Sequence, residues 1–268
     1  MGQIYAFEGI DGAGKTHAIK RVQQHLMSVH NRNVVVMNDW VMLPKMKELM
    51  IKSKCDNTAR LMMVLLARSK SMALLKKLAK VPDLIILMDR YALSTVVYQC
   101  CDMTDNEFQC WYDDWFDVIE QFTLPNVIPV YIRPTESYFE KYRERMEKRG
   151  QVNEFDRLDP KPYIEAYDFF LRAGDTHDMP TREDLELWQQ NRRQWPRIFN
   201  YFTRYVIDNS GTNDFNIRCC CLAAQIDERA SGDDFSSGLV RGLADQINEN
   251  DYREKLKKKI AGRSGVLL

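Results

Sequence analysis

The residues whose types and spacing best suit chemistry lie at positions 9–16, which read Gly-Ile-Asp-Gly-Ala-Gly-Lys-Thr. This segment fits the pattern G-x-x-x-x-G-K-[ST], in which glycines let the backbone curl and point its N–H groups at phosphate oxygens. We therefore predict an ATP-binding loop in which Lys15 contacts the β- and γ-phosphates and Thr16 holds Mg²⁺. The residues predicted to bind the nucleotide are Gly9, Asp11, Gly12, Ala13, Gly14, Lys15 and Thr16.

A second candidate group lies where another apolar run ends in an acid. Residues 84–88 read Leu-Ile-Ile-Leu-Met and are followed by Asp89 and Arg90. A carboxylate at the end of a buried strand commonly orients Mg²⁺ or its water ligands beside a phosphate-binding loop. The alternative is an aspartate that caps the following helix. Thr16 and Asp89 are the predicted metal-binding residues.

Five short apolar runs predict the strands that position both groups: Ile4–Glu8, Val34–Asn38, Leu84–Asp89, Val127–Ile132 and Tyr205–Asp208. Segments with helical character separate them, at Lys15–Val29, Thr58–Ala79, Glu107–Phe122 and Glu136–Arg149. This alternation predicts βαβ units. We therefore expect an α/β, three-layer fold with a central five-stranded parallel sheet flanked by helices, and ligands at the carboxyl ends of the strands.

The composition limits the partners and the location. The 268 residues carry 38 Lys+Arg and 38 Asp+Glu, so no overall field attracts nucleic acid or membrane. We see no apolar run of about 18 residues and no signal sequence, so we expect no membrane association and a cytoplasmic location. The seven cysteines lack paired metal-ligand spacing and are expected to be reduced thiols.

Together the two motifs resemble the thymidylate kinase family. The resemblance is carried by residues 7–16, Phe-Glu-Gly-Ile-Asp-Gly-Ala-Gly-Lys-Thr, and residues 89–99, Asp-Arg-Tyr-x-x-Ser-Thr-x-x-Tyr-Gln. It covers about residues 3–168 and the strand at 205–208, and it implies the P-loop kinase fold. The catalytic residues that it implies, together with the loop residues above, are Lys15, Asp11, Asp89, Arg90, Arg145 and Arg149.

The same resemblance implies roles for substrate-binding residues. Arg90 would grip the acceptor phosphate and Arg68 would contact the base, and a guanidinium fork suits the first of these tasks. Thr95 and Gln99 would lie near the pyrimidine edge, and Tyr98 against the deoxyribose. The full predicted set is Asp39, Trp40, Val64, Arg68, Arg90, Ser94, Thr95, Tyr98 and Gln99. For Ser94 and Tyr98 the alternative is helix capping and packing.

The segment after the second strand departs from the family's pattern. It reads Asn38-Asp39-Trp40 in place of the usual Arg-Glu-Pro, and Val64 stands where a phenylalanine would stack on thymine. Losing that ring face weakens stacking and widens the pocket, unless Trp40 compensates. The predicted acceptor is therefore dTMP or an analogue with a larger 5-substituent.

A charged segment carries Arg143, Arg145 and Arg149, and Gly150 follows it. The resemblance implies a mobile lid at about residues 143–157, whose arginines stabilise charge on the transferred phosphoryl group. Because position 12 in the phosphate loop is glycine and not a basic residue, the lid would have to supply that charge. Solvated pairs with neighbouring glutamates are the alternative.

We predict a kinase domain over residues 1–225, with an extra helical segment at 171–204, and a C-terminal appendage over 226–268 that is helical or partly disordered. The resemblance implies a homodimer. The divergence and the appendage would suit a virally encoded enzyme, which would place it in the host cytoplasm.

Four functions remain open. The favoured one is transfer of the γ-phosphoryl group from ATP to dTMP or an analogue, because the arginines suit an anionic substrate. A kinase that acts on a modified base within DNA, of the hydroxymethyluracil type, is less favoured, and the basic tail around Lys257 would bind the nucleic acid. A deoxynucleoside kinase would use Asp39 as base. A non-catalytic nucleotide-binding module conflicts with intact Lys15 and Asp89.

Overall fold

The five predicted strands are all present and form one parallel sheet. The computed structural model describes residues 2–52, 56–100, 115, 118–119, 121–124, 126–135, 138, 160–171, 205–209, 211 and 213–231. The strands are β1 (Gln3–Glu8), β2 (Asn33–Met37), β3 (Leu84–Asp89), β4 (Val127–Pro134) and β5 (Tyr205–Asn209). Their order is β2-β3-β1-β4-β5, and every neighbouring pair is parallel. The predicted α/β class with a five-stranded parallel sheet is confirmed, and the strand ends differ from the prediction by at most two residues.

The central strands are apolar on both faces because helices cover both faces of the sheet. Along β1, Tyr5 and Phe7 belong to one buried cluster, whereas Ile4 and Ala6 belong to the other. Successive side chains of a strand point to opposite faces, so β1 contributes to both halves of the core. The continuous apolar run that predicted each central strand therefore reflects burial from two sides.

Six helices are assigned within the described residues: α1 (Lys15–Ser28), α2 (Pro44–Lys52), α3 (Asn57–Leu78), α4 (Ala92–Cys100), α7 (Lys161–Leu171) and α9 (Asn213–Ala230). The segments predicted as helices at 15–29 and 58–79 correspond to α1 and α3. Most of the predicted helices at 107–122 and 136–149, the whole lid at 143–157, and residues 172–204 and 232–268 lie outside the described residues. Helix α9 continues through residue 226, where the appendage was predicted to begin.

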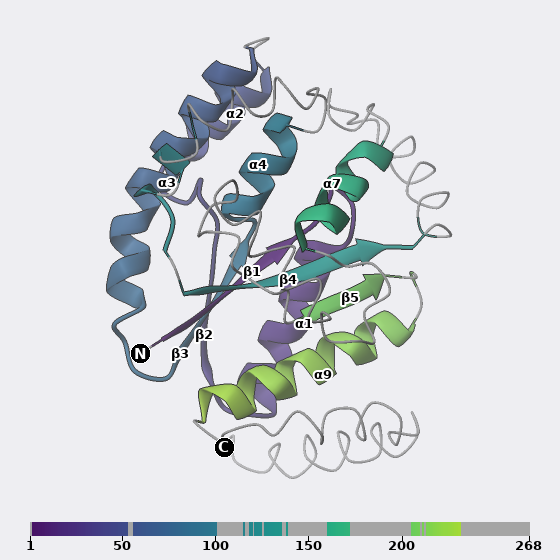
Figure 1. Ribbon diagram of the computed structural model, residues 1–268. Coiled ribbons are helices and arrows are strands. Elements are labelled where there is room, and N and C mark those ends of the chain that lie inside the picture. The colour runs from purple at the N-terminus through teal and green to yellow at the C-terminus, as the bar shows by residue number, and fades with distance from the viewer. Residues whose placement is uncertain are drawn as a thin grey trace, which may run out of the picture.

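The helices form two layers around the sheet. Figure 1 shows α1 and α9 together on one side of the sheet and α3, α4 and α7 on the other. The predicted apolar face of α1, Ile19, Val22 and Leu26, is buried in the core that includes α9. In open α/β sheets of this kind, ligands bind at the carboxyl ends of the strands.

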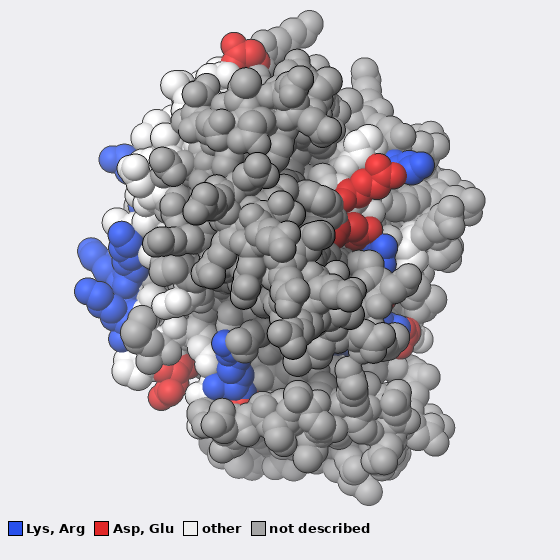
Figure 2. Space-filling model, in the orientation of Figure 1, with Lys and Arg blue, Asp and Glu red and all other residues white. Residues whose placement is uncertain are grey.

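Helix α3 is held at both ends by local electrostatics. Asp56 caps its start, where the carboxylate Oδ1 accepts a hydrogen bond of 2.7 Å from the backbone N–H of Ala59. Its last turn carries Lys76 and Lys77, where positive charge interacts favourably with the helix dipole. Figure 2 shows Lys and Arg side chains gathered at the left edge of the visible face, over this helix. Local helix chemistry thus accounts for the two lysines of the last turn.

The sheet register brings the two sequence motifs together. Strands β1 and β3 are neighbours, and Phe7 of β1 lies opposite Asp89 of β3. The loop at residues 9–16 follows β1 and the Asp89-Arg90 pair ends β3, so both lie at the same edge of the sheet. None of the helices in the described part of the chain is both long enough and apolar enough to cross a membrane.

Candidate active site

The loop at residues 9–16 has a backbone that needs glycine at two positions. Gly9 and Gly14 adopt positive φ angles of 135° and 98°. A Cβ atom on Gly14 would lie 2.5 Å from the side-chain nitrogen of Asn209, and one on Gly9 would lie 2.6 Å from the carbonyl oxygen of Ile132. The loop is therefore packed directly against the ends of β4 and β5, and only glycine allows that close approach.

Lys15 lies buried at the start of α1, with 6% of its surface exposed. Its ammonium group donates hydrogen bonds of 3.0 Å to the carbonyl oxygen of Gly9 and 2.6 Å to that of Ile10. Burial, together with the nearby positive charge of Arg90, lowers the pKa of Lys15 to about 8. A bound phosphate would raise this pKa again, because an anion favours the protonated amine.

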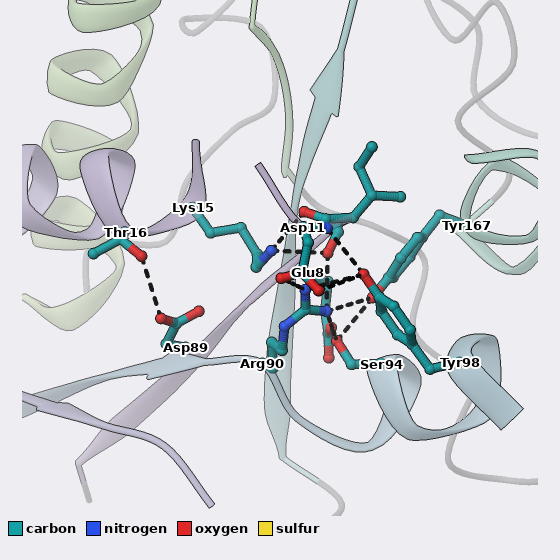
Figure 3. A network of polar contacts seen from close by, with 11 residues as sticks. Glu8, Asp11, Lys15, Thr16, Asp89, Arg90, Ser94, Tyr98 and Tyr167 are labelled. Atoms are coloured by element: carbon teal, nitrogen blue, oxygen red, sulfur yellow. Dashed lines mark hydrogen bonds and ion pairs between the residues drawn. The ribbon is translucent and has the colours of Figure 1, made fainter. Parts of the chain in front are cut away.

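Arg90 occupies an unusual conformation beside this loop. Its φ angle is 71°, and its backbone N–H donates a 3.1 Å hydrogen bond to Phe7. Its guanidinium group donates to the carbonyl oxygen of Gly9 at 3.1 Å and to the Asp11 carboxylate at 2.6 Å. Positive φ is strained for a residue with a side chain, and such strain concentrates at functional sites. Figure 3 shows the Arg90 guanidinium next to the Lys15 ammonium.

Charges around Arg90 keep it and its partner ionised. Burial opposes ionisation of Asp11, but the positive charges of Arg90 and Lys15 outweigh it and hold the pKa of the carboxyl well below its usual range. Burial likewise opposes the charge on Arg90, yet Asp11 raises the pKa of the guanidinium further above its usual value. The loop therefore carries a fixed cation that is only partly neutralised, which suits a second anionic group.

Tyr98 links this arginine to the loop. Its hydroxyl accepts hydrogen bonds from the backbone N–H of Asp11 at 2.9 Å and from Arg90 at 3.1 Å, and the guanidinium carbon lies 4.7 Å from the ring centroid. Burial raises the pKa of this phenol well above its usual value. The predicted contact between Tyr98 and a deoxyribose stays a prediction. The observed contacts make Tyr98 a support for Arg90.

A buried carboxylate that the sequence analysis did not assign lies behind Arg90. Glu8 is 1% exposed and accepts hydrogen bonds from the backbone N–H of Tyr91 at 3.0 Å and from the Ser94 hydroxyl. The Ser94 and Tyr167 hydroxyls lie 2.8 Å apart, and burial raises the pKa of Glu8. Ser94 takes part in a buried network with Glu8 and Tyr167 (Figure 3), and its predicted contact with the substrate stays a prediction. The sequence contains one clue to Glu8, because this residue lies between Phe7 and Gly9 in the segment 7–16 that resembles the family.

Thr16 and Asp89 lie together, as predicted for a metal site. The hydroxyl of Thr16 donates to the Asp89 carboxylate at 3.5 Å, and Figure 3 shows this pair on the far side of Lys15 from Tyr98. The described residues contain no group of three His, Cys, Asp or Glu side chains suited to a metal. Mg²⁺ at phosphate sites uses one or two protein oxygens and takes the rest from phosphates and water. The Thr16 hydroxyl and the Asp89 carboxylate are two adjacent oxygen ligands, so they fit Mg²⁺.

A second polar cluster lies beyond the phosphate loop, where Asp39 follows β2 and Arg68 lies on α3. The guanidinium of Arg68 donates to the same Asp39 oxygen, Oδ2, from Nε at 3.1 Å and from Nη2 at 2.8 Å. Nη2 also donates to the Thr95 hydroxyl at 2.6 Å, and the guanidinium carbon lies 5.2 Å from the centroid of the Tyr91 ring. We call this the Asp39–Arg68 pair. Its side chains are 8% and 1% exposed.

The other predicted base-contacting residues have less defined roles. Val64 is half-buried on α3, one turn before Arg68, and Trp40 is half-buried in the turn after β2, where its backbone N–H bonds to Asn38. Gln99 lies on α4, and its side chain is outside the described part of the structure. Arg143, Arg145 and Arg149 lie entirely outside the described residues, so their lid role stays a prediction.

Two further residues, which no motif in the sequence singles out, fix the loop from the opposite side. Asn209, 3% exposed at the end of β5, donates to the carbonyl oxygen of Ala13 at 2.7 Å and accepts from the backbone N–H of Gly211 at 2.9 Å. The hydroxyl of Tyr138 donates to the carbonyl oxygen of Gly12 at 2.7 Å. These contacts hold the carbonyl groups of Gly12 and Ala13 and so anchor the second half of the loop.

The geometry agrees with the comparisons to known proteins. The family model described as thymidylate kinase matches residues 7–124, a span that includes the phosphate loop, the Asp39–Arg68 pair and Arg90. The match to this family identifies the chain as a nucleoside monophosphate kinase, and it accounts for the joint presence of a phosphate loop and the motif at 89–99.

Relatives within the thymidylate kinase family are distant. "Probable thymidylate kinase 1" of Saccharolobus solfataricus is 28% identical over 160 residues, which span 58% of this chain and 81% of that protein. "Probable thymidylate kinase" of Sulfurisphaera tokodaii is 29% identical over 130 residues, 48% of this chain and 62% of that protein. The crystal structure of thymidylate kinase from Ehrlichia chaffeensis matches with a TM-score of 0.50 and 17% identity, over 84% of this chain and 98% of that one. This last likeness supports the fold.

Proposed function

We propose that the protein transfers the γ-phosphoryl group of ATP to a deoxypyrimidine nucleoside monophosphate, dTMP or a 5-substituted analogue. The observation that carries this proposal is the position of Arg90. A strained backbone and five hydrogen bonds of the side chain hold its guanidinium against the loop, beside Lys15. Lys15 and Arg90 are two cations at the carboxyl ends of neighbouring strands. They suit two phosphate groups, one on the donor and one on the acceptor.

The donor phosphates would bind in the curve of the loop. Backbone N–H groups of the loop, apart from those of Asp11 and Ala13 that bond to Tyr98 and Ile10, and the N-terminus of α1 provide donors and partial positive charge. Lys15 would exchange its contacts with Gly9 and Ile10 for oxygens of the β- and γ-phosphates. The charge that develops on the transferred group would then face a preorganised cation, which lowers the barrier without a proton transfer.

Thr16 and Asp89 would hold Mg²⁺ together with the phosphates. The bound ion would neutralise charge on the β- and γ-phosphates, and the chain's own share of the task is to keep the two oxygen groups adjacent. Their 3.5 Å separation already meets that requirement.

The acceptor would be held by Arg90. A monophosphate near neutral pH is already largely dianionic, so it needs alignment and charge screening more than a general base. Arg90 can offer both, because its contacts with Asp11, Ser94 and Tyr98 fix its position while it remains a quarter exposed. The names of the two archaeal relatives support a thymidylate as the acceptor.

Replacement of Arg90 tests the proposal most directly. We expect Arg90→Ala to reduce kcat/KM for dTMP by about 10²-fold or more, measured as ADP release that depends on the monophosphate. Arg90→Lys keeps the charge but loses the fork, so it should recover only part of the activity. Arg218→Ala on α9, which removes an exposed arginine paired with Asp214, is the matched control. Full activity of Arg90→Ala on the free nucleotide would contradict the assignment.

The two alternative kinase functions have separate tests. A deoxynucleoside kinase would phosphorylate thymidine and lose that activity in Asp39→Asn, yet Oδ2 of Asp39 is engaged by Arg68 in the structure. The basic tail invoked for a kinase of DNA bases lies outside the described residues, and that function requires transfer of labelled phosphate to modified duplex DNA but not to mononucleotides.

The predicted homodimer has support in one exposed apolar surface. Helices α2 and α3 pack together and expose apolar side chains, Leu49, Ile51, Met62 and Leu66. Apolar groups of this size gathered on neighbouring helices are typical of protein interfaces. Sedimentation equilibrium should give twice the chain mass, and Met62→Lys should shift the protein toward the monomer. A monomeric wild type would contradict the homodimer.

A further inference from the structure

The Asp39–Arg68 pair has one unused polar atom on each side chain. Oδ2 of Asp39 takes both contacts from the guanidinium, and the Thr95 hydroxyl takes a third. Within the part of the chain that the structure describes, neither Asp39 Oδ1 nor Arg68 Nη1 has a hydrogen-bond partner, although both atoms are buried. Buried polar atoms are almost always paired, and leaving one unpaired is costly. Two such atoms on one ion pair point to a ligand that completes them.

The chemistry of the two atoms defines that ligand. A guanidinium nitrogen can only donate a hydrogen bond, and an ionised carboxylate oxygen can only accept one. The ligand must therefore bring an acceptor to Arg68 and a donor to Asp39. The pair is neutral overall, so it suits an uncharged polar group and not a second phosphate. An unpaired arginine in the same place would instead attract an anion.

The pair lies next to the site proposed for the acceptor phosphate. Thr95, which contacts Arg68, follows Ser94 on α4, and Ser94 contacts Arg90. Tyr91, whose ring lies beside the Arg68 guanidinium, directly follows Arg90 in the chain. A nucleotide whose phosphate binds Arg90 would therefore extend its nucleoside toward the pair. The inference rests on the proposed function in this respect.

We propose that Asp39 determines base specificity by accepting a hydrogen bond from the ring N–H of a uracil-type or thymine-type base, while Arg68 donates to the adjacent carbonyl oxygen. Such a base presents a carbonyl oxygen beside an acidic imide N–H, and a carboxylate forms its strongest hydrogen bonds with acidic donors. Substituents at position 5 leave this edge unchanged. Cytosine carries an unprotonated nitrogen at the same ring position, where its lone pair would face the lone pairs of Asp39.

The wild-type protein gives the first test. Initial rates with dTMP, dUMP, dCMP and the 3-N-methyl derivative of dTMP should show kcat/KM lower by about tenfold or more for the last two substrates, because each leaves the Asp39 carboxylate without a donor. Equal use of dTMP and dCMP, or of dTMP and its methyl derivative, would overturn the proposal. This comparison needs no variant and so does not depend on how a variant folds.

A substitution at Asp39 gives the second test. The carboxamide in Asp39→Asn can rotate to present either an acceptor or an N–H donor. The ratio of kcat/KM for dTMP to that for dCMP should therefore fall by about tenfold, with a gain for dCMP relative to dTMP. A purely structural role would lower kcat/KM for all substrates by the same factor, and that result would overturn the proposal. Glu48→Gln, an acid-to-amide change at an exposed position on α2, is the matched control.

The outcomes separate the inference from the proposed function. If the protein phosphorylates no free monophosphate, the proposed function and this inference both fail. If it phosphorylates dTMP but Asp39→Asn leaves the substrate ratio unchanged, only the role of Asp39 fails. Thermal unfolding of each variant shows whether a lost activity reflects lost structure.

Discussion

Two arginine–aspartate pairs contact side chains of α4, and they differ in what surrounds them. The Arg90–Asp11 pair is partly open, with side chains 25% and 50% exposed, and Arg90 also donates to Gly9, Ser94 and Tyr98. The Asp39–Arg68 pair is closed, with side chains 8% and 1% exposed, and it retains an unpaired atom on each partner. The first pair holds a cation ready for an anion, and the second holds a neutral donor and acceptor.

The difference shows how burial sets the task of an ion pair. Arg90 and Asp11 are more exposed than the second pair, so water screens their attraction more and a phosphate can replace Asp11 at a lower cost. In the interior, separating Arg68 from Asp39 would leave an uncompensated charge. Arg68 therefore cannot be released toward an anionic ligand, and only its remaining nitrogen can serve recognition. The predictions below test this contrast, from the largest expected effect to the smallest.

Lys15→Met should have the largest effect, a loss in kcat of about 10³-fold, because the variant lacks the charge aimed at the transferred phosphoryl group. Burial lowers the pKa of Lys15, so its charge is costly in the folded protein, and the variant should unfold at the same or a higher temperature. Activity and thermal unfolding are measured together, with the exposed Lys20→Met on the same helix as control. If Lys15→Met remained active, the proposed role of Lys15 in phosphoryl transfer would be wrong.

Asp39→Ala and Asp11→Ala should differ in their cost to stability. The first leaves the buried Arg68 unpaired and should lower the free energy of unfolding by about 3 kcal/mol. The second breaks a half-exposed pair and should cost about 1 kcal/mol or less. Urea unfolding of both variants measures the difference. Equal losses would show that the two pairs do not differ in the way their burial indicates.

Tyr98→Phe should have a smaller effect, confined to the binding of the monophosphate by Arg90. It removes the hydroxyl that accepts from Arg90 and from the backbone of Asp11, so the KM for the monophosphate should rise by about three- to tenfold with kcat nearly unchanged. Tyr5→Phe, whose hydroxyl bonds to Gln3 at the other end of β1, is the control. A loss in kcat alone would mean that Tyr98 does not act through ground-state binding.

The pH dependence of ATP binding should be the smallest effect. Because the pKa of Lys15 is lowered to about 8, the free protein loses this charge above that pH, and its affinity for ATP should fall on the alkaline side. The effect of Lys15 on stability has the opposite sign. Its folded-state pKa lies below the unfolded value of 10.5, so the unfolded chain binds more protons between these values and stability rises with pH. Titration calorimetry on either side of pH 8 tests the first expectation.

The phosphate-binding part of the site, the loop at residues 9–16 with Arg90, was largely predictable from the sequence. Gly9, Gly14 and Lys15 are recognisable because the curvature of the loop and its approach to phosphate limit each position to one residue type. Arg90 was recognisable through its place directly after Asp89. Glu8 and Asn209 were not assigned, because their contacts join segments that are up to 196 residues apart in the chain.

The Asp39–Arg68 pair, which is the proposed base-binding part of the site, was only partly predictable. The sequence singled out Asp39 and Arg68 separately, but it left Asp39 either as a base for a hydroxyl or as one of several substrate-binding residues. Their ion pair depends on how α3 crosses from β2 to β3, and residues 29 positions apart carry no spacing rule that reveals it. Helices α2, α4, α7 and α9 were not delimited either, because tertiary packing more than local periodicity stabilises them.

The sequence by itself determined the five strands, their parallel class and the phosphate loop, because continuous apolar runs and obligatory glycines are local properties of the chain. Only the tertiary structure decided which charges are paired and which polar atoms remain unpaired. That outcome depends on burial and on the meeting of distant elements, which set the cost of every separated charge.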